Sequence, residues 1–248
     1  MVLITLLLSS FDLLSEIATV VLTNVLDFMK ALLPVYMVSL GLNLGQGGAI
    51  AYYNMALVII SIINALCLHL LLPAVEIFML LSLVNNISKE DIISKGAELI
   101  KKLVNYALNG LFAIVTGMNV IQSMLLPVTG SIRNQAASSV LGIMSGGMAN
   151  NITGLAYGTA NAVKSGIGTA GMLILVAIVT VPILKVLVFI LGYNVTTVML
   201  QPITDKRIIK SIEAVADGAT LLLKCIFVCT FMLILTIAII CLTTNQTV

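Results

Sequence analysis

Long apolar stretches, separated by a few polar segments, dominate the pattern of this chain. They cover residues 50–84, 103–126, 170–191 and 220–242, and a helix needs about 20 mostly apolar residues to cross a bilayer. The first stretch would be about 50 Å long as one helix, so we expect Pro73 to divide it into a span and a second half-helix. The pattern predicts an all-α, polytopic helical membrane protein with about five to six spanning helices plus broken or re-entrant helices.

The first 30 residues have a different pattern. Their polar residues recur every three or four positions and fall on one narrow stripe of a helix; these are Asp12, Glu16, Thr19, Thr23, Asp27 and Lys30. We therefore divide the chain into an amphipathic N-terminal helix, residues 1–30, and a polytopic membrane domain, residues 31–248. The helix either lies at the membrane surface with its stripe among the headgroups, or spans the membrane with its stripe facing water or another subunit.

Glycine-rich segments mark two further features. Residues 41–48 follow a short apolar piece that begins near Pro34, and they predict a flexible turn within either a re-entrant hairpin or a thin crossing. Residues 127–169 carry small residues at every fourth position, among them Gly142, Gly146, Gly154 and Gly158. Such rows let helices approach closely in membranes. Residues four positions apart drift around the surface of a helix, so two helices broken near Asn150 and Asn151 fit the row best. The row either packs within the chain or forms a subunit interface or a pore-lining hairpin.

The charged residues amount to only 9% of the chain and gather in two loops, at about residues 85–102 and 202–217. Both loops are rich in lysine or arginine, which predicts that both face the cytoplasm. Ser88 and Asp91 form a capping-box start for a surface helix in the first loop. The net charge is +2 without a basic face, so the partner that we expect is the lipid bilayer and not nucleic acid.

Two sets of polar residues lie inside apolar stretches. Lys185 follows Pro182 by three residues within a span, where a lysine is costly unless it snorkels or pairs. His69 and Glu76 are seven residues apart on one helix face. They form either a proton relay or part of an interface.

Catalytic motifs are missing from the sequence. Ser145 and His69 are the only available Ser and His pairing, and Ser145 lacks nucleophile-elbow spacing. There is neither an H-E-x-x-H motif nor a glycine-rich nucleotide loop. The four cysteines lie in apolar stretches without metal-site spacing, so we interpret them as buried small hydrophobes. We expect no enzyme activity, no metal and no cofactor.

Five motifs in a fixed order resemble the stage III sporulation protein AE family of endospore-forming bacteria. They are Ala31-Leu-Leu-Pro34 followed by Gly47-Gly48, then Leu72-Pro73, Val181-Pro-Ile-Leu-Lys185, Leu200-Gln-Pro-Ile-Thr-Asp-Lys-Arg207 and Ala216-Asp-Gly218. Within them, Pro202, Asp205 and Asp217 are structural or interface candidates.

The resemblance implies a non-enzymatic membrane subunit of the sporulation channel that joins mother cell and engulfed forespore. It implies a location in the mother-cell-derived membrane around the forespore and a role beside the other stage III A proteins and stage II protein Q. A second copy of the chain, in a homo-oligomer, is a further candidate partner. Family members are usually longer at the N-terminus. The alternatives are a small-solute permease or channel subunit, with a site at the broken helices 41–48 and 150–158, and a scaffold without a conduit.

Overall fold

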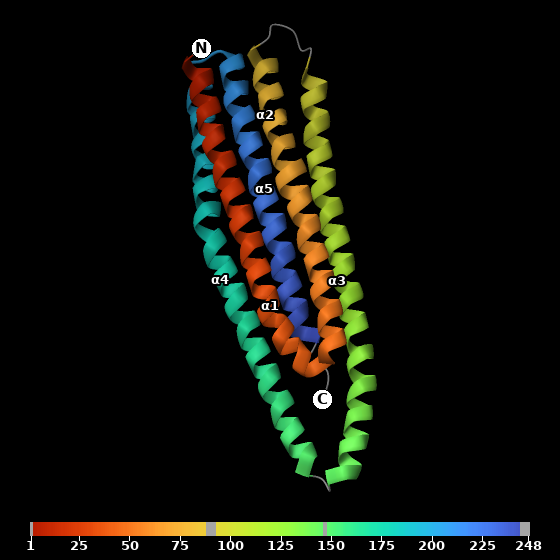
Figure 1. Cartoon of the computed structure of the whole chain (residues 1–248). Helices are drawn as coiled ribbons and strands as arrows, with labels where there is room; N and C mark the ends of the chain where they lie inside the picture. Colours follow the sequence, from red (N-terminus) through yellow and green to blue (C-terminus); the bar gives the residue numbers. More distant parts are fainter. Residues whose placement is uncertain (1, 88–92, 146–147, 244–248) are drawn as a thin grey trace. The chain divides into compact units, whose positions relative to one another are not determined.

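The computed structural model describes the backbone of residues 2–87, 93–145 and 148–243, and the side chains of these residues except 38–49, 51–52, 87, 122–161, 163–164 and 239–243. Its elements are the helix α1 (Val2–Leu66), the π-helix η1 (Cys67–Leu71), and the helices α2 (Leu72–Ile87), α3 (Ser94–Ser145), α4 (Met148–Leu200) and α5 (Lys206–Thr243) (Figure 1). Among the described residues there is no strand.

Five helical segments are long and apolar enough to cross a membrane. They are Val2–Met37, Tyr53–Asn86, Ser94–Ile121, Ser165–Leu200 and Lys206–Ala238. The predicted class, an all-α polytopic membrane protein with about five to six spans, is confirmed.

The chain divides into two compact units. Unit 1 comprises Met1–Val25, Ile63–Phe112 and Ala177–Phe231, and unit 2 comprises Leu26–Ile62, Ala113–Val176 and Met232–Val248. The helices α1, α3, α4 and α5 each contribute residues to both units, whereas α2 belongs to unit 1.

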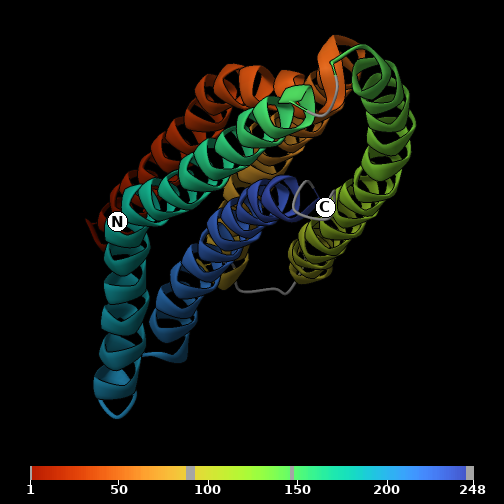
Figure 2. The same ribbon diagram turned by 90° about the horizontal axis from the view of Figure 1, so that it is seen from below.

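The helix α1 does not end at residue 30. It continues through Lys30 and Pro34 to Leu66, so the expected boundary between residues 30 and 31 falls inside one helix. The glycine-rich residues 41–48 keep a helical backbone, and in unit 2 the chain reverses direction in the orange part of Figures 1 and 2. The first 36 residues of this helix have the length and composition of a span.

Pro73 does not divide the second span. The preceding residues form η1, and the Leu72 N–H donates to the Cys67 carbonyl five residues earlier. Because proline has no N–H for the carbonyl four residues before it, the widened π-turn absorbs the mismatch and the helix continues. A single candidate span, Tyr53–Asn86, replaces the expected span and half-helix.

The first polar segment contains the start of a helix, as expected, and the second is also largely helical. The helix α3 begins at Ser94 and α5 at Lys206, so most of the described part of residues 85–102 and 202–217 belongs to helices. A helix satisfies its own backbone hydrogen bonds and can extend beyond the bilayer with its polar side chains exposed. The expected pair of helices is present, since α3 ends at Ser145 and α4 begins at Met148, a few residues before the expected break at Asn150 and Asn151. The capping box at Ser88 and Asp91 lies outside the described residues.

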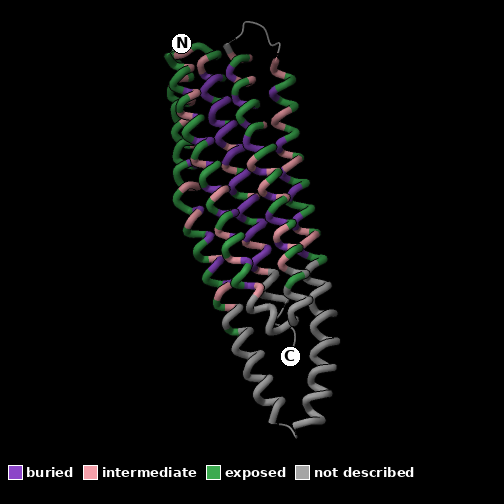
Figure 3. Tube along the Cα trace, viewed as in Figure 1, coloured by how far each residue is buried: buried purple, intermediate pink, exposed green. Residues whose placement is uncertain are grey.

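Burial is uneven among the helices (Figure 3). In the most apolar window of each span, 56% of the residues are buried in Lys206–Ala238 but only 17% in Ser165–Leu200. Lys206–Ala238 in α5 is therefore the most buried of the five candidate spans, whereas Ser165–Leu200 in α4 exposes most of its apolar surface.

Candidate functional site

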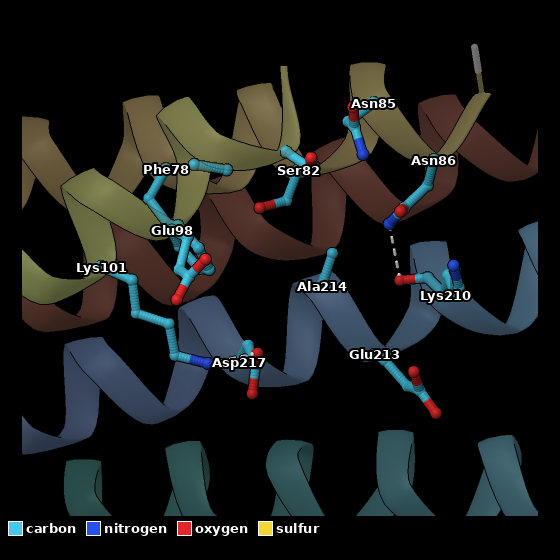
Figure 4. A pocket seen from close by; sticks show the side chains of 12 residues that line it. Phe78, Ser82, Asn85, Asn86, Glu98, Lys101, Lys210, Glu213, Ala214 and Asp217 are labelled. Carbon is cyan, nitrogen blue, oxygen red and sulfur yellow. Dashed lines mark hydrogen bonds and ion pairs between the residues drawn. The ribbon is translucent and has the colours of Figure 1, made fainter. Parts of the chain in front are cut away.

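A polar pocket of about 320 Å³ lies in unit 1, where α2 ends and α3 and α5 begin (Figure 4). Each of the three helices supplies polar or charged side chains to it: Ser82, Asn85 and Asn86 from α2, Ser94, Glu98 and Lys101 from α3, and Lys210, Glu213 and Asp217 from α5. Phe78, Ala97 and Ala214 complete its wall. Residues of the two expected cytoplasmic loops, 85–102 and 202–217, thus lie together at one end of unit 1.

An ion pair closes one side of this pocket. The Lys101 Nζ lies 2.6 Å from the Asp217 Oδ2 and 5.7 Å from the centre of the Phe78 ring. In Figure 4 the lysine side chain extends from α3 towards Asp217 on α5. Both charged side chains are more than one third exposed, so the pair fixes geometry more than it adds stability. The sequence had singled out Asp217 without its partner, which lies 116 residues away.

Two asparagines tie the end of α2 to its neighbours. The Asn86 Nδ2 donates to the Lys210 carbonyl at 2.8 Å, and the Ile93 N–H donates to the Asn85 Oδ1 at 3.1 Å. Sequence reasoning alone does not identify either asparagine as a functional residue, since an Asn near the end of an apolar run is an ordinary boundary signal. Together they join the end of α2 to α5 and to the residue that precedes α3.

Gly218 explains how closely α5 packs beside the pocket. A Cβ at this position would lie 2.7 Å from the Phe11 Cε2 and 3.4 Å from the Met79 side chain. Phe11 and Met79 are both buried. The glycine of the Ala216-Asp-Gly218 motif is therefore the point where α1, α2 and α5 approach one another in unit 1.

Pro202 and Asp205 lie in the short turn between α4 and α5. The Leu200 carbonyl accepts from the N–H groups of Ile203 and Thr204 at 3.0 and 2.9 Å, and Pro202 follows the helix end, where a missing N–H costs little. Asp205 occupies the N-cap position of α5, and its carbonyl accepts a hydrogen bond from the Ile208 N–H at 3.0 Å. These two residues form a turn, not a ligand site.

His69 and Glu76 are both exposed, and Glu76 has a different partner. The Ser15 hydroxyl on α1 donates to the Glu76 Oε1 at 2.5 Å. The structure thus assigns Glu76 a role in joining α1 to α2 and shows no hydrogen bond between it and His69 in the described part of the chain.

The polar stripe of α1 points away from the core. Asp12, Glu16 and Thr19 are exposed, whereas Leu14 and Ala18 on the opposite face are fully buried. In unit 2, Asp27 continues the stripe and pairs with Lys30 at 3.2 Å.

Pro182 and Lys185 lie inside α4, and Lys185 is exposed. Within the described residues, Lys185 forms no ion pair. Val186 beside it is fully buried, so Lys185 borders the packed face of α4.

The row of Gly142, Gly146, Gly154 and Gly158 lies outside the described residues and stays a prediction. Cys67, Cys225 and Cys229 are free and buried, as expected for small hydrophobes. Among the residues that the structure describes, no group of three or more His, Cys, Asp or Glu side chains could hold a metal ion.

The described residues therefore bring polar side chains together in two places, a pocket at one end of unit 1 and an exposed stripe on α1. A family model, stage III sporulation protein AE, matches residues 1–244. A curated relative, stage III sporulation protein AE of Bacillus subtilis (strain 168), is 23% identical over 250 residues, covering 100% of this chain and 63% of the relative. The chain thus spans less than two thirds of that relative's length. No solved structure matches it.

Proposed function

The chain belongs to the stage III sporulation protein AE family, and from this premise we propose that it is a membrane subunit of a multi-protein sporulation channel. This channel would link the mother cell to the engulfed forespore and support forespore development after engulfment. The subunit would lie in the mother-cell-derived membrane around the forespore and act beside the other stage III A proteins and stage II protein Q.

One structural observation supports this proposal most strongly. The stripe of α1 carries Asp12 and Glu16 on the outer surface of a candidate span, with no cationic partner in the described part of the chain. A carboxylate that faces lipid near the middle of a span costs about 2.5 to 3.5 kcal/mol. The stripe is therefore suited to water or to another subunit, as in an assembly of several membrane proteins.

The orientation of this subunit follows from its basic segments. We propose that the end of unit 1 that carries the polar pocket faces the cytoplasm, because the lysines of its two polar segments, among them Lys95 and Lys210, are typical of cytoplasmic loops. Single cysteines at Lys95 and Thr244, in a background without native cysteines, should react differently with an impermeant thiol reagent added from outside. Equal reaction at both positions would refute this orientation.

A solitary small-solute permease is the alternative function. It would have to bind and move its solute alone, whereas a subunit of a shared conduit would be inactive in isolation. We propose reconstituting the purified chain in liposomes and measuring the uptake of a panel of amino acids, nucleosides and sugars. The channel subunit should show no saturable uptake; saturable uptake of one solute class would favour the permease.

Copurification provides the positive test. Tagged protein solubilised from sporulating cells should carry other stage III A proteins with it, while the same protein from vegetative cells should not. Recovery of the tagged chain alone from both sources would argue against the multi-protein channel.

A further inference from the structure

We propose that this chain self-associates through an antiparallel contact between α1 of one copy and α4 of the next, in which Glu16 pairs with Lys185. The contact goes beyond the proposed function and does not rest on it, since a permease could assemble in the same way. Four observations within unit 1 carry the inference.

The first observation is a pair of opposite, unpaired charges. Glu16 on α1 and Lys185 on α4 are both exposed, and neither forms an ion pair with any residue that the structure describes. The neighbouring Glu76 already accepts a hydrogen bond from Ser15. Glu16 is thus the exposed carboxylate near the middle of the α1 span that still lacks a partner.

The second observation is that both charges lie deep in their spans. A rise of about 1.5 Å per residue puts Glu16 within about 5 Å of the midpoint of Val2–Met37 and Lys185 within about 4 Å of the midpoint of Ser165–Leu200. Ionisable groups at such depths face protein or water and pair with one another. No residue that the structure describes forms an ion pair with either side chain, so a second copy is a candidate source of the opposite charge.

The third observation is a matching depth. The start of α1 and the end of α4 lie at the same end of unit 1. Phe11 and Met79 both lie beside Gly218, whereas Ser15, further along α1, bonds to Glu76, further from the end of α2, so the two helices run antiparallel. Asn86 at the end of α2 bonds to Lys210 near the start of α5, which follows the end of α4 after a short turn. Glu16 lies about 21 Å from that end along α1, and Lys185 about 22 Å from it along α4. Copies inserted in the same orientation consequently bring these two charges to the same level.

The fourth observation is a hollow on α4 beside Lys185. It has a volume of about 270 Å³ and is lined by Val188, Phe189, Gly192, Tyr193 and Thr196. The rings of Phe189 and Tyr193 stack at 6.4 Å, and Gly192 has open space where a side chain would be.

An apolar side chain on α1 fits this hollow in the same register. Leu13 is 53% exposed and lies three residues before Glu16, so it shares that face of the helix. Leu13 and Phe189 both lie about 16 Å from the common end of unit 1. When Glu16 meets Lys185 of the next copy, Leu13 therefore reaches the hollow beside Phe189.

The geometry of this contact is heterologous, since α1 of one copy meets α4 of the next. Such contacts form a closed ring when the rotation between copies closes. α4 is also the least buried of the five candidate spans, so it has the most surface to give to a neighbouring copy.

The test is cysteine crosslinking between two differently tagged copies of the full chain, coexpressed in a bacterial membrane without sporulation proteins. One copy carries Leu13→Cys and the other Phe189→Cys, in a background whose native cysteines are replaced and whose accumulation is verified. We expect a disulfide that joins the two tags. As a matched control, Tyr106→Cys, which is 72% exposed at a similar depth on α3, should give at least tenfold less product with Leu13→Cys.

The ion pair is then tested by charge reversal. Adding Lys185→Glu to the Phe189→Cys copy should lower the crosslink yield at least tenfold, and adding Glu16→Lys to the Leu13→Cys copy should restore it to within twofold. Absence of a crosslink between tags, or a failure of Glu16→Lys to restore it, would overturn the proposal. A disulfide that forms only when both cysteines are in the same copy would also overturn it.

Discussion

Replacing Gly218 by alanine should destabilise unit 1, because the new methyl group has no room. Its Cβ would lie 2.7 Å from the Phe11 Cε2, about 0.7 Å inside the 3.4 Å at which ordinary contact begins. The Phe11 ring is only 1% exposed and Met79 is equally buried on another side, so the ring can move only by displacing its neighbours. Overpacking of this kind costs about 1 to 3 kcal/mol.

The helix propensity of alanine opposes this cost and has to be removed by a control. Glycine to alanine in a helix interior gains about 0.8 to 1 kcal/mol. Gly110, in the helix α3 of the same unit, has no atom within 4 Å of its would-be Cβ. Gly110→Ala carries the propensity gain without the overlap, so the two variants should differ by about 1 to 3 kcal/mol.

The assay is reversible unfolding in mild detergent, with the free energy of unfolding taken from the denaturant dependence of the helical signal. We expect Gly218→Ala to be the less stable variant and Phe11→Leu to reduce its deficit, since a smaller side chain relieves the overlap. A coupling of about 0.5 to 3 kcal/mol between the two substitutions is typical of residues in contact. Equal stability of Gly218→Ala and Gly110→Ala would refute the close approach.

Two further predictions concern buried and exposed polar contacts. Thr236→Val removes the hydroxyl that accepts a hydrogen bond from the Asn119 Nδ2 at 3.1 Å, and it should lower the free energy of unfolding by about 0.6 kcal/mol and at most about 1.7. Thr230→Val removes a buried hydroxyl that has no partner among the described residues, so it should be neutral or stabilising. Equal costs of the two substitutions in the unfolding assay would contradict this. Asp217→Asn, which breaks the exposed pair with Lys101, should cost less than about 1 kcal/mol and nothing in 1 M salt, so a larger or salt-independent loss would show that the pair is not screened by solvent.

The helical class could be predicted from the sequence because hydrocarbon allows few solutions. A lipid-exposed segment must satisfy its backbone hydrogen bonds internally, so each long apolar stretch has to be a helix. The burial of α5 had no such signal. Its mean hydropathy of 2.5 equals that of Tyr53–Asn86 and is below the 2.9 of Ser165–Leu200, so hydropathy does not identify α5 as the most buried span.

Local breaks were predicted less well. Pro73 is a strong signal for interruption in water, yet the backbone stays helical there. The glycines at 41–48 also keep a helical backbone, although the chain reverses direction in this part of unit 2. A proline can be absorbed by a widened turn such as η1, and in a membrane neighbouring groups replace the lost backbone hydrogen bond. Composition alone does not show when this happens.

The candidate site shows the same division between local and distant information. The stripe that includes Asp12 and Glu16 was visible as a periodicity, and its exposure agrees with that pattern. The pairing of Lys101 with Asp217 was not visible, because nothing local connects residues 116 positions apart. The pair His69 and Glu76 shared a face in the sequence, but the partner of Glu76 proved to be Ser15 on another helix.

The most direct test of the proposed role is deletion of the gene in the spore-forming organism that carries it. Heat-resistant spores are counted, and the stage of arrest is followed by microscopy with a membrane dye. The account predicts that engulfment is completed, that forespore development then stops, and that a wild-type copy of the gene restores spore formation. A deletion strain that forms heat-resistant spores as abundantly as its parent would contradict it.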